Sequence, residues 1–394
     1  MSNVPHLRFP EFDGEWEEST IGEQFDLYSG NTPSRLNKEH FNGSINWISS
    51  GELKEHYIKD SKEKISEEAA KNLKMLPKGT FVIAIYGLEA EGVRGTGSIL
   101  LNNATISQAC MAFSHKAEIT NEFLYSWYKK HGNVIGIRYA QGTKQQNLSY
   151  DILEKFKISY PAIQEQEKLN RFISLLDKRI TTQNKIIEDL KKLKSAISKQ
   201  AFAQKPNGWN RLDTLFSKGK AGGTPTSTNK EYYNGEIPFL SINDITKQGK
   251  YVRYTENHLS RSGLENSSAW VVPEYSLIIS MYASVGLVTI NEVPITTSQA
   301  MFAMQLRDKD LLDYLYYYLS YFKYRHIHKF LETGTQSNIN ADTVRGIMIP
   351  TYGHSRNMKI ASTLQSIDAK IDNELSVLKL FNRQKNYHLS QMFI

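Results

Sequence analysis

The sequence predicts an α+β (mixed α/β) protein in which two duplicated globular domains are separated by two long helices. Three observations support this class. Residues 164–202 contain neither Gly nor Pro and repeat apolar residues at heptad-like spacing, which indicates one long helix. Residues 357–393 carry a weaker copy of that pattern. The short motifs that precede the first helix also recur, in the same order, before the second.

The two helical segments predict an antiparallel coiled-coil pair. In the first, Leu169, Leu176 and Leu190 share one heptad position, and about 40 residues at roughly 1.5 Å each form a rod of about 60 Å. A constant shift in numbering superposes Asp177 on Asp368. If the rods bury their apolar stripes on each other, the second must run back towards the first domain, and a pseudo-two-fold axis relates the domains. The same symmetry relates the strands of a DNA duplex, although a helical pair that only joins two domains has the same spacing.

Recurring loop motifs place the domain boundaries. Gly30-Asn31-Thr32-Pro33 in the first half corresponds to Gly222-Gly223-Thr224-Pro225 in the second. Short β-branched and aromatic runs between such turns, for example residues 45–48, predict strands. We therefore expect a first domain at residues 1–162 with an N-terminal arm, a spacer helix at 163–205, a second domain at 206–355 and a closing spacer helix at 356–394.

The composition is basic and poor in cysteine. Lys and Arg number 48 against 41 Asp and Glu, a net charge of +7 that suits a polyanionic partner but also a Lys-rich, solvated helix face. Cys110 is the only cysteine, so neither a disulfide nor a zinc cluster is expected within the chain, and a reducing compartment is predicted. The sequence shows no signal-peptide pattern or spanning apolar run, which predicts a cytoplasmic protein without membrane association.

Motifs of the common DNA-modifying enzymes are missing. The sequence contains neither the Gly-rich cofactor loop and Asn/Asp-Pro-Pro-aromatic element of an adenine methyltransferase nor the phosphate-cradling loop of an ATP-driven motor. Glu52-Leu53-Lys54 fits a nuclease fragment, but a three-residue pattern occurs by chance and has no counterpart in the second half. The sequence therefore predicts a protein without a catalytic or metal site of its own.

Small polar loops supported by glycine recur in both halves. Reading base edges requires Asn, Gln, Ser, Thr, Arg or Lys on backbone that approaches the groove closely, and these loops offer that chemistry. One loop taken alone is better explained as a turn that caps its own backbone, whereas three duplicated sets give the binding interpretation about equal weight. We predict DNA contacts in the first half from Thr32, Ser34, Arg35, Ser49, Ser50, Arg94, Thr143, Lys144, Gln145, Gln146 and Asn147, and in the second half from Thr224, Thr226, Ser227, Ser241, Asn243, Thr335, Gln336, Ser337 and Asn338.

The combined pattern resembles the specificity subunit of type I restriction-modification systems over nearly the whole chain. The resemblance rests on the Leu-Arg-Phe-Pro-Glu-Phe arm at residues 7–12, the Thr224-Pro225 loop, the Gly142-Thr143 loop with Gln145 to Asn147, and residues 161–168, Pro-Ala-Ile-Gln-Glu-Gln-Glu-Lys. The sequence departs from the family pattern twice. Asn31 stands where a second glycine is usual, and Gly353-His354-Ser355-Arg356 replaces the Glu-Gln signature before the second helix, so the docking surface there is expected to differ in detail.

The resemblance implies that each domain is a target-recognition domain reading one half of a bipartite double-stranded DNA site, and that the helical pair sets the half-site spacing. It implies no cofactor in this chain. Two modification subunits would bring S-adenosylmethionine and methylate adenine, and restriction subunits would bring ATP- and Mg-dependent translocation and cleavage. The competing interpretation is a paired-domain coiled-coil scaffolding protein without sequence-specific DNA recognition, and a third is an enzyme with an unrecognised site.

Overall fold

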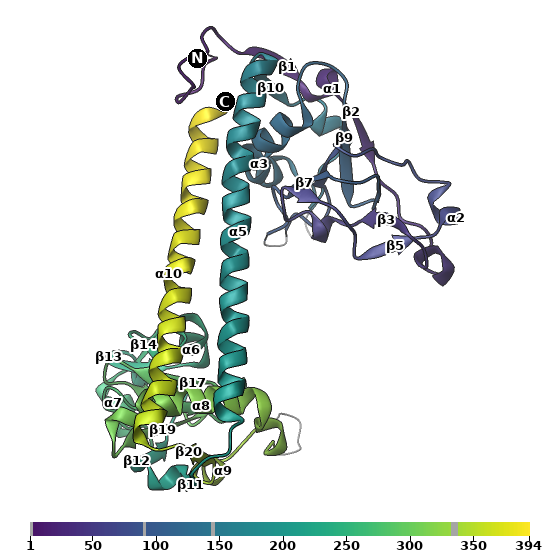
Figure 1. Ribbon diagram of the computed structural model, residues 1–394. Coiled ribbons are helices and arrows are strands. Elements are labelled where there is room, and N and C mark those ends of the chain that lie inside the picture. Colours follow the sequence, from purple (N-terminus) through teal and green to yellow (C-terminus); the bar gives the residue numbers. More distant parts are fainter. Residues whose placement is uncertain (1–2, 90–91, 143–145, 332–337) are drawn as a thin grey trace. The chain divides into compact units, whose positions relative to one another are not determined.

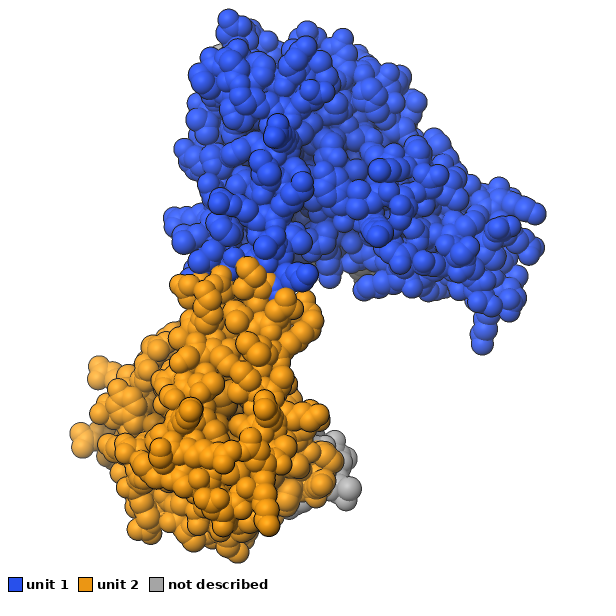
Figure 2. Space-filling view, viewed as in Figure 1, with its two compact units in different colours: residues 1–185, 376–394 blue, residues 186–375 orange. Residues whose placement is uncertain are grey.

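The computed structural model describes residues 3–89, 92–142, 146–331 and 338–394. The chain divides into two compact units (Figure 2), one formed by residues 1–185 and 376–394 and the other by residues 186–375. Both units therefore contain a globular part and a portion of each long helix. In the described part of the chain, no helix combines the length and apolarity needed to cross a bilayer.

The two long helices, α5 (Ile163–Phe202) and α10 (His354–Met392), agree with the helices predicted from the heptad pattern. They lie side by side and run antiparallel in each unit (Figure 1). In the first unit Asp177 of α5 pairs with Lys385 of α10, and in the second Lys194 of α5 pairs with Asp368 of α10, both at 2.5 Å. Residues later in α5 thus face residues earlier in α10, as predicted.

The first unit contains two small sheets, and helix α3 (Asn121–Tyr139) packs on the larger of them. One sheet has the strand order β2-β9-β6-β7-β4, antiparallel except for the β4 and β7 pair, and the other has the order β5-β3-β8. The strands are β2 (Phe25–Ser29), β3 (Ile45–Ile48), β4 (Tyr57–Ile58), β5 (Glu63–Ile65), β6 (Phe81–Ala84), β7 (Gly97–Leu100), β8 (Thr105–Ile106) and β9 (Cys110–His115). A separate pair joins β1 (Glu17–Thr20) to β10 (Lys157–Tyr160), and short helices are α1 (Ile21–Gln24), α2 (Glu67–Ala70) and α4 (Tyr150–Leu153).

The second unit repeats this topology strand for strand, which confirms the duplicated fold. Its sheets have the orders β12-β19-β16-β17-β14 and β15-β13-β18, and β11 pairs with β20. The strands are β11 (Gly208–Arg211), β12 (Phe216–Ala221), β13 (Tyr233–Leu240), β14 (Tyr251–Val252), β15 (Asn257–Leu259), β16 (Leu277–Ser280), β17 (Val288–Asn291), β18 (Thr296–Thr297), β19 (Met301–Leu306) and β20 (Met348–Thr351). The helices are α6 (Ile242–Gln248), α7 (Arg261–Glu265), α8 (Leu312–Arg325) and α9 (Ala341–Arg345).

Each core joins a sheet, one helix and the long-helix pair. In the first unit Phe81 and Phe113 of the sheet pack with Phe123 of α3, and Phe393, just beyond α10, lies against Phe123 with ring centroids 5.3 Å apart. In the second unit Phe202 of α5 occupies the corresponding place against the tyrosines of α8. Because Phe202 and Phe393 hold equivalent positions in the repeat, the same contact fastens each globular part to the end of a long helix.

The two long helices begin differently because the Glu-Gln motif at the start of α5 is replaced at the start of α10. In the first unit the carboxylate of Glu165, 2% exposed, accepts two hydrogen bonds from Arg8 of the N-terminal arm, at 2.8 and 2.7 Å. In the second unit the equivalent position is Arg356, which donates to the side chain of Gln204 in the connecting segment. The arm is therefore held by a partly buried ion pair that has no counterpart in the second unit among the described residues.

Candidate nucleic-acid interface

The predicted loops of the first unit emerge at one edge of its two sheets. Strands β2, β3, β6 and β8 end at this edge and β9 begins there, as the paired residues at the ends of the ladders show: Ser29 with Met111, Ala84 with Cys110, and Ile48 with Ile106. The loops after β2, β3 and β6 and the turn between β8 and β9 therefore lie together. We call this edge the loop edge.

Backbone hydrogen bonds tie these loops to one another in the first unit. The N–H groups of Gly30 and Asn31 donate to the carbonyls of Cys110 and Ile106, each at 3.1 Å. The Ile85 N–H donates to Ala109, and the Leu148 N–H, just after the Gly142 loop, donates to Ile85, both at 2.9 Å. These bonds bring segments far apart in the sequence, including the loop before α4, to one place.

The second unit repeats the arrangement bond for bond. Its Gly222 and Gly223 N–H groups donate to Met301 and Thr297 at 3.0 and 2.9 Å, Met281 donates to Ala300 at 2.7 Å, and Ile339 donates to Met281 at 3.0 Å. Each donor and acceptor is the counterpart in the repeat of one in the first unit. The loop edge is therefore a duplicated feature of the structure and not a coincidence of one loop.

Close backbone approach explains the glycine at the start of the first loop. A Cβ atom at Gly222 would lie 2.0 Å from the carbonyl oxygen of Thr297, and one at Gly30 would lie 2.3 Å from that of Ile106. At the next position the units differ, because a Cβ at Gly223 would lie 2.2 Å from Ser268 Oγ. In the first unit Asn31 stands there, and its side chain accepts a hydrogen bond from the Thr32 N–H at 2.8 Å.

Arg35 projects from the first loop but is already paired. Its guanidinium donates to both carboxylate oxygens of Glu63, at 3.0 and 2.8 Å, and lies 4.5 Å from the ring centroid of Phe41. The hydrogen bonds from Arg35 hold the pKa of Glu63 below its ordinary value. The side chain of Arg35 is still 57% exposed, so it remains accessible to a phosphate or a base edge.

Two of the predicted serines cap helices. The N–H and Oγ of Ser49 donate to Glu52 at 2.9 and 2.7 Å, and those of Ser241 donate to Asp244 at 2.8 and 2.6 Å. Each pair forms a capping box that satisfies backbone donors at a helix start. Both serines therefore have the local role that the alternative interpretation of these loops predicts, in which side chains cap the backbone of their own turn.

Arg94, Gln146 and Asn147 come together in the first unit although the sequence separates them. Arg94 Nη2 donates to Gln146 Oε1 at 3.1 Å, and the backbone of Asn147 exchanges two hydrogen bonds of 2.9 Å with Gln141. Arg94 Nε and Asn147 Oδ1 are buried without a hydrogen-bond partner among the described residues. A surface cavity of about 500 Å³ adjoins Asn147, and it is lined also by Ser29, Tyr86, Gln141, Gly142 and Tyr150.

In the second unit, two of the predicted side chains at the loop edge already form hydrogen bonds with other side chains. Thr224 donates to the side chain of Gln299, and Asn243 Nδ2 donates to Glu256 at 2.8 Å. Thr226 and Ser227 are exposed. Gln299 and its counterpart Gln108 are exposed residues of this edge that were not among the predicted contacts, although the recurring Ser-Gln-Ala motif could have identified them.

The remaining predicted residues divide into two groups. Ser34 is exposed, and Thr32, Ser50 and Asn338 are half-buried at the loop edge of their own unit. The predicted contacts Thr143, Lys144, Gln145, Thr335, Gln336 and Ser337 lie outside the described residues. Within the described ranges, no group of three or more His, Cys, Asp or Glu side chains could hold a metal ion.

Comparison with known proteins gives a consistent family. The family model of the type I restriction modification DNA specificity domain matches residues 13–192 and again residues 206–379. The MjaIX specificity subunit of Methanocaldococcus jannaschii is 25% identical over 259 residues, 59% of either chain. The EcoR124I/EcoR124II specificity subunit of Escherichia coli is 33% identical over 190 residues, 47% of this chain and 45% of the relative. The chain thus spans about half the length of these curated relatives.

A solved structure matches over the full length. The S subunit of a type I restriction-modification system from M. genitalium superposes with a TM-score of 0.61 at 16% identity and covers 99% of both chains. At this identity the likeness concerns the fold, which includes the long helices and both globular parts.

Proposed function

The chain belongs to the type I restriction modification DNA specificity family and carries two copies of its domain, and we propose that each copy reads one half of a bipartite site in double-stranded DNA. The duplicated loop edge carries this proposal. In both units the same backbone hydrogen bonds gather Asn, Gln, Ser and Thr side chains at the edge of the sheets, and the first unit adds Arg35 and Arg94. These are the side chains that read donor and acceptor patterns in a groove.

The two half-sites are expected to differ in sequence. The first unit presents Arg94, Gln146 and Asn147 at its loop edge, with two buried polar atoms that lack a described partner. At equivalent positions of the loop after the first strand of each large sheet, the first unit has Ser34 and Arg35 where the second has Thr226 and Ser227. Since base recognition depends on which donors and acceptors stand at each position, equivalent backbones with different side chains select different bases.

The long helices are proposed to act as the spacer and as the docking surface for two modification subunits. Along α5 and α10, large apolar side chains remain exposed, namely Leu175, Ile186, Leu193, Leu375, Leu380 and Tyr387. Exposed apolar side chains in such number suit a protein interface. The modification subunits would bind S-adenosylmethionine, restriction subunits would use ATP and Mg, and this chain would contribute recognition without catalysis, in the cytoplasm with the DNA.

The test is a binding selection with the full chain in complex with its modification subunits. A library of duplexes with randomised sequence is incubated with the complex, and the bound fraction is sequenced. We expect an enriched motif made of two short blocks separated by a gap of fixed length. A scaffolding protein enriches no motif, and a contiguous motif contradicts two-domain reading. The chain alone, given S-adenosylmethionine, is expected to leave DNA unmethylated.

A further inference from the structure

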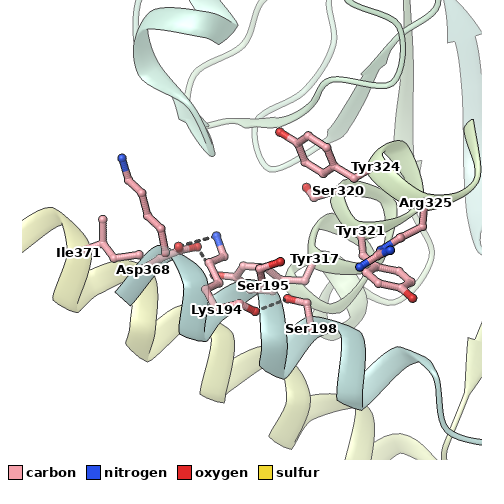
Figure 3. Close-up of a pocket in the computed structure, with 11 residues that line it drawn as sticks. Lys194, Ser195, Ser198, Tyr317, Ser320, Tyr321, Tyr324, Arg325, Asp368 and Ile371 are labelled. Atoms are coloured by element: carbon pink, nitrogen blue, oxygen red, sulfur yellow. Dashed lines mark hydrogen bonds and ion pairs between the residues drawn. The ribbon is translucent and has the colours of Figure 1, made fainter. Parts of the chain in front are cut away.

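Each unit fastens its globular part to the long helices through an ionic cluster, and the two clusters are built from equivalent positions. Asp177 with Lys385 in the first unit corresponds to Asp368 with Lys194 in the second, so the acid and the base exchange helices between units. Figure 3 shows Lys194 and Asp368 joined across the two helices, with Tyr317 of α8 beside them. A third group from the globular part completes each cluster, and here the units differ.

In the first unit the third group is His56, which immediately precedes β4. Its Nδ1 lies 2.8 Å from Asp177 Oδ2 on α5, an ion-pair distance without hydrogen-bond geometry, and its Nε2 forms a hydrogen bond of 3.0 Å with Glu122 Oε2 on α3. The imidazole is stacked between the rings of Tyr57 and Tyr125, at centroid distances of 4.1 and 3.9 Å and nearly parallel. Held from four sides and 8% exposed, the ring joins the sheet edge to both α3 and α5.

In the second unit the residue before β14 is Lys250. Its ammonium lies 2.6 Å from Asp313 Oδ1, at the start of α8, and 3.1 Å from the Tyr317 hydroxyl. That hydroxyl donates to Asp368 Oδ2 at 2.8 Å, so the lysine reaches the long helices through Tyr317. Asp313 is the counterpart of Glu122, and the ammonium stands where the imidazole stands in the first unit.

His56 is surrounded by charged groups, so the charge on its imidazole affects the contacts that it makes. The charged or titratable groups around it are Glu55 and Tyr57 on its own segment, Asp177 and Lys178 on α5, Glu122, Tyr125 and Lys129 on α3, and Lys385 on α10. Strand β7, whose Ile99 N–H donates to the His56 carbonyl, carries no titratable side chain. A surface cavity of about 560 Å³ lined by His56, Tyr57 and Asp177 gives solvent access to the cluster.

We propose that His56 is a positioning residue that holds the first recognition domain on α5 only while its imidazole is protonated, whereas the second domain has Lys250 in place of a histidine at the equivalent position. The proposal rests on the proposed function, because the orientation of a recognition domain on the helices decides where its loop edge meets DNA. The protein would then lose base preference at one half-site when the pH rises moderately above neutrality, and it would keep base preference at the other.

The direction of the pH dependence follows from the contacts. Burial by itself lowers the pKa of His56, but the contacts with Asp177 and Glu122 outweigh burial and raise the pKa above the ordinary value of 6.5. Burial likewise acts to raise the pKa of Asp177, and His56 and Lys385 together bring it below the ordinary value. A raised histidine pKa stabilises the folded state fully below pH 6.5, and this stabilisation is lost as the pH rises through the raised value. A lysine ammonium carries its charge throughout this range.

The first experiment needs no DNA. Amide hydrogen exchange of the full chain, corrected for intrinsic rates, is compared between about pH 6 and about pH 9 for the β4 and α3 segments and for the equivalent β14 and α8 segments. We expect protection in the first unit to fall at the higher pH as the imidazole loses its proton, while the second unit stays unchanged.

Reciprocal substitutions show whether His56 is the group that titrates. The variant His56→Lys copies the second unit and should abolish the pH response, and His56→Gln should show the lower protection at both pH values. Lys250→His should transfer the response to the second unit, which remains informative if a change at residue 56 prevents folding. A wild-type chain without a pH response, or a His56→Lys variant that responds as the wild type does, overturns the proposal.

The second experiment adds the functional consequence. The randomised-duplex selection is repeated with the complex at both pH values. The wild type should lose sequence definition in one block at the higher pH, and His56→Lys should retain both blocks. If no bipartite motif is enriched at either pH, the proposed function fails. The exchange data still decide whether the contacts of His56 with Asp177 and Glu122 open as the pH rises. If the motif is enriched equally at both pH values although hydrogen exchange shows that the His56 contacts open, these contacts do not affect DNA recognition and that part of the proposal is wrong.

Discussion

Shortening both long helices by one matched turn tests the spacer role most directly. The pairs Asp177 with Lys385 and Lys194 with Asp368 share one register, so residues 182–185 of α5 are opposite residues 377–380 of α10. Deleting both four-residue segments keeps the two ion pairs opposite one another. Deleting only one segment leaves the register broken, because both ion pairs cannot then form together.

The size of the effect follows from helix geometry. Four residues shorten each helix by about 6 Å, and at 3.6 residues per turn they rotate its far end by about 40° beyond a full turn. One base pair of DNA rises about 3.4 Å and rotates by roughly 35° in the same right-handed sense. The rotation matches one base pair and the translation is less than two. We therefore expect the preferred gap between half-sites to shrink by one base pair, and by two at most.

The assay is the randomised-duplex selection with the complex of the double-deletion variant. Both blocks of the motif should be retained, because the loop edges are untouched, and only the gap between them should change. The single deletion from α5 is the control and should lose affinity instead of shifting the gap. An unchanged gap at undiminished affinity in the double deletion would refute the spacer argument.

Three further predictions test individual contacts. Gln146→Ala and Asn147→Ala together should relax base preference in one block by about 1–3 kcal/mol per lost bidentate contact, with the other block as an internal control in the same selection. Ser241→Ala should cost about 1 kcal/mol in the free energy of unfolding through its lost cap, and Ser241→Asn should restore stability. If the motif changes in both variants, Ser241 also reads bases. Arg8→Ala leaves the Glu165 carboxylate buried and should lower the free energy of unfolding by about 3 kcal/mol. Denaturant unfolding measures this loss, and adding Glu165→Gln should recover part of it.

The sequence by itself determined the duplication, the two long helices and their antiparallel direction. These features are written in local periodicity: the heptad pattern predicts residues 164–202 as helical, and the structure has a helix at Ile163–Phe202. The repeat of motifs then requires two units of one fold. Such signals do not depend on which distant segments meet.

The tertiary structure alone decided how the loops meet and which side chains are engaged. Leu148 joins Ile85 and Asn31 joins Ile106 through backbone bonds that no local pattern encodes, so the loop edge was visible in the sequence only as separate glycine-rich turns. The pairing of Arg35 with Glu63 likewise needs strand β5 to lie beside β3. His56 shows the difference most clearly. Its partners Glu122 and Asp177 stand on two later helices. The sequence shows only a lone histidine, and folding alone places two carboxylates next to its two ring nitrogens.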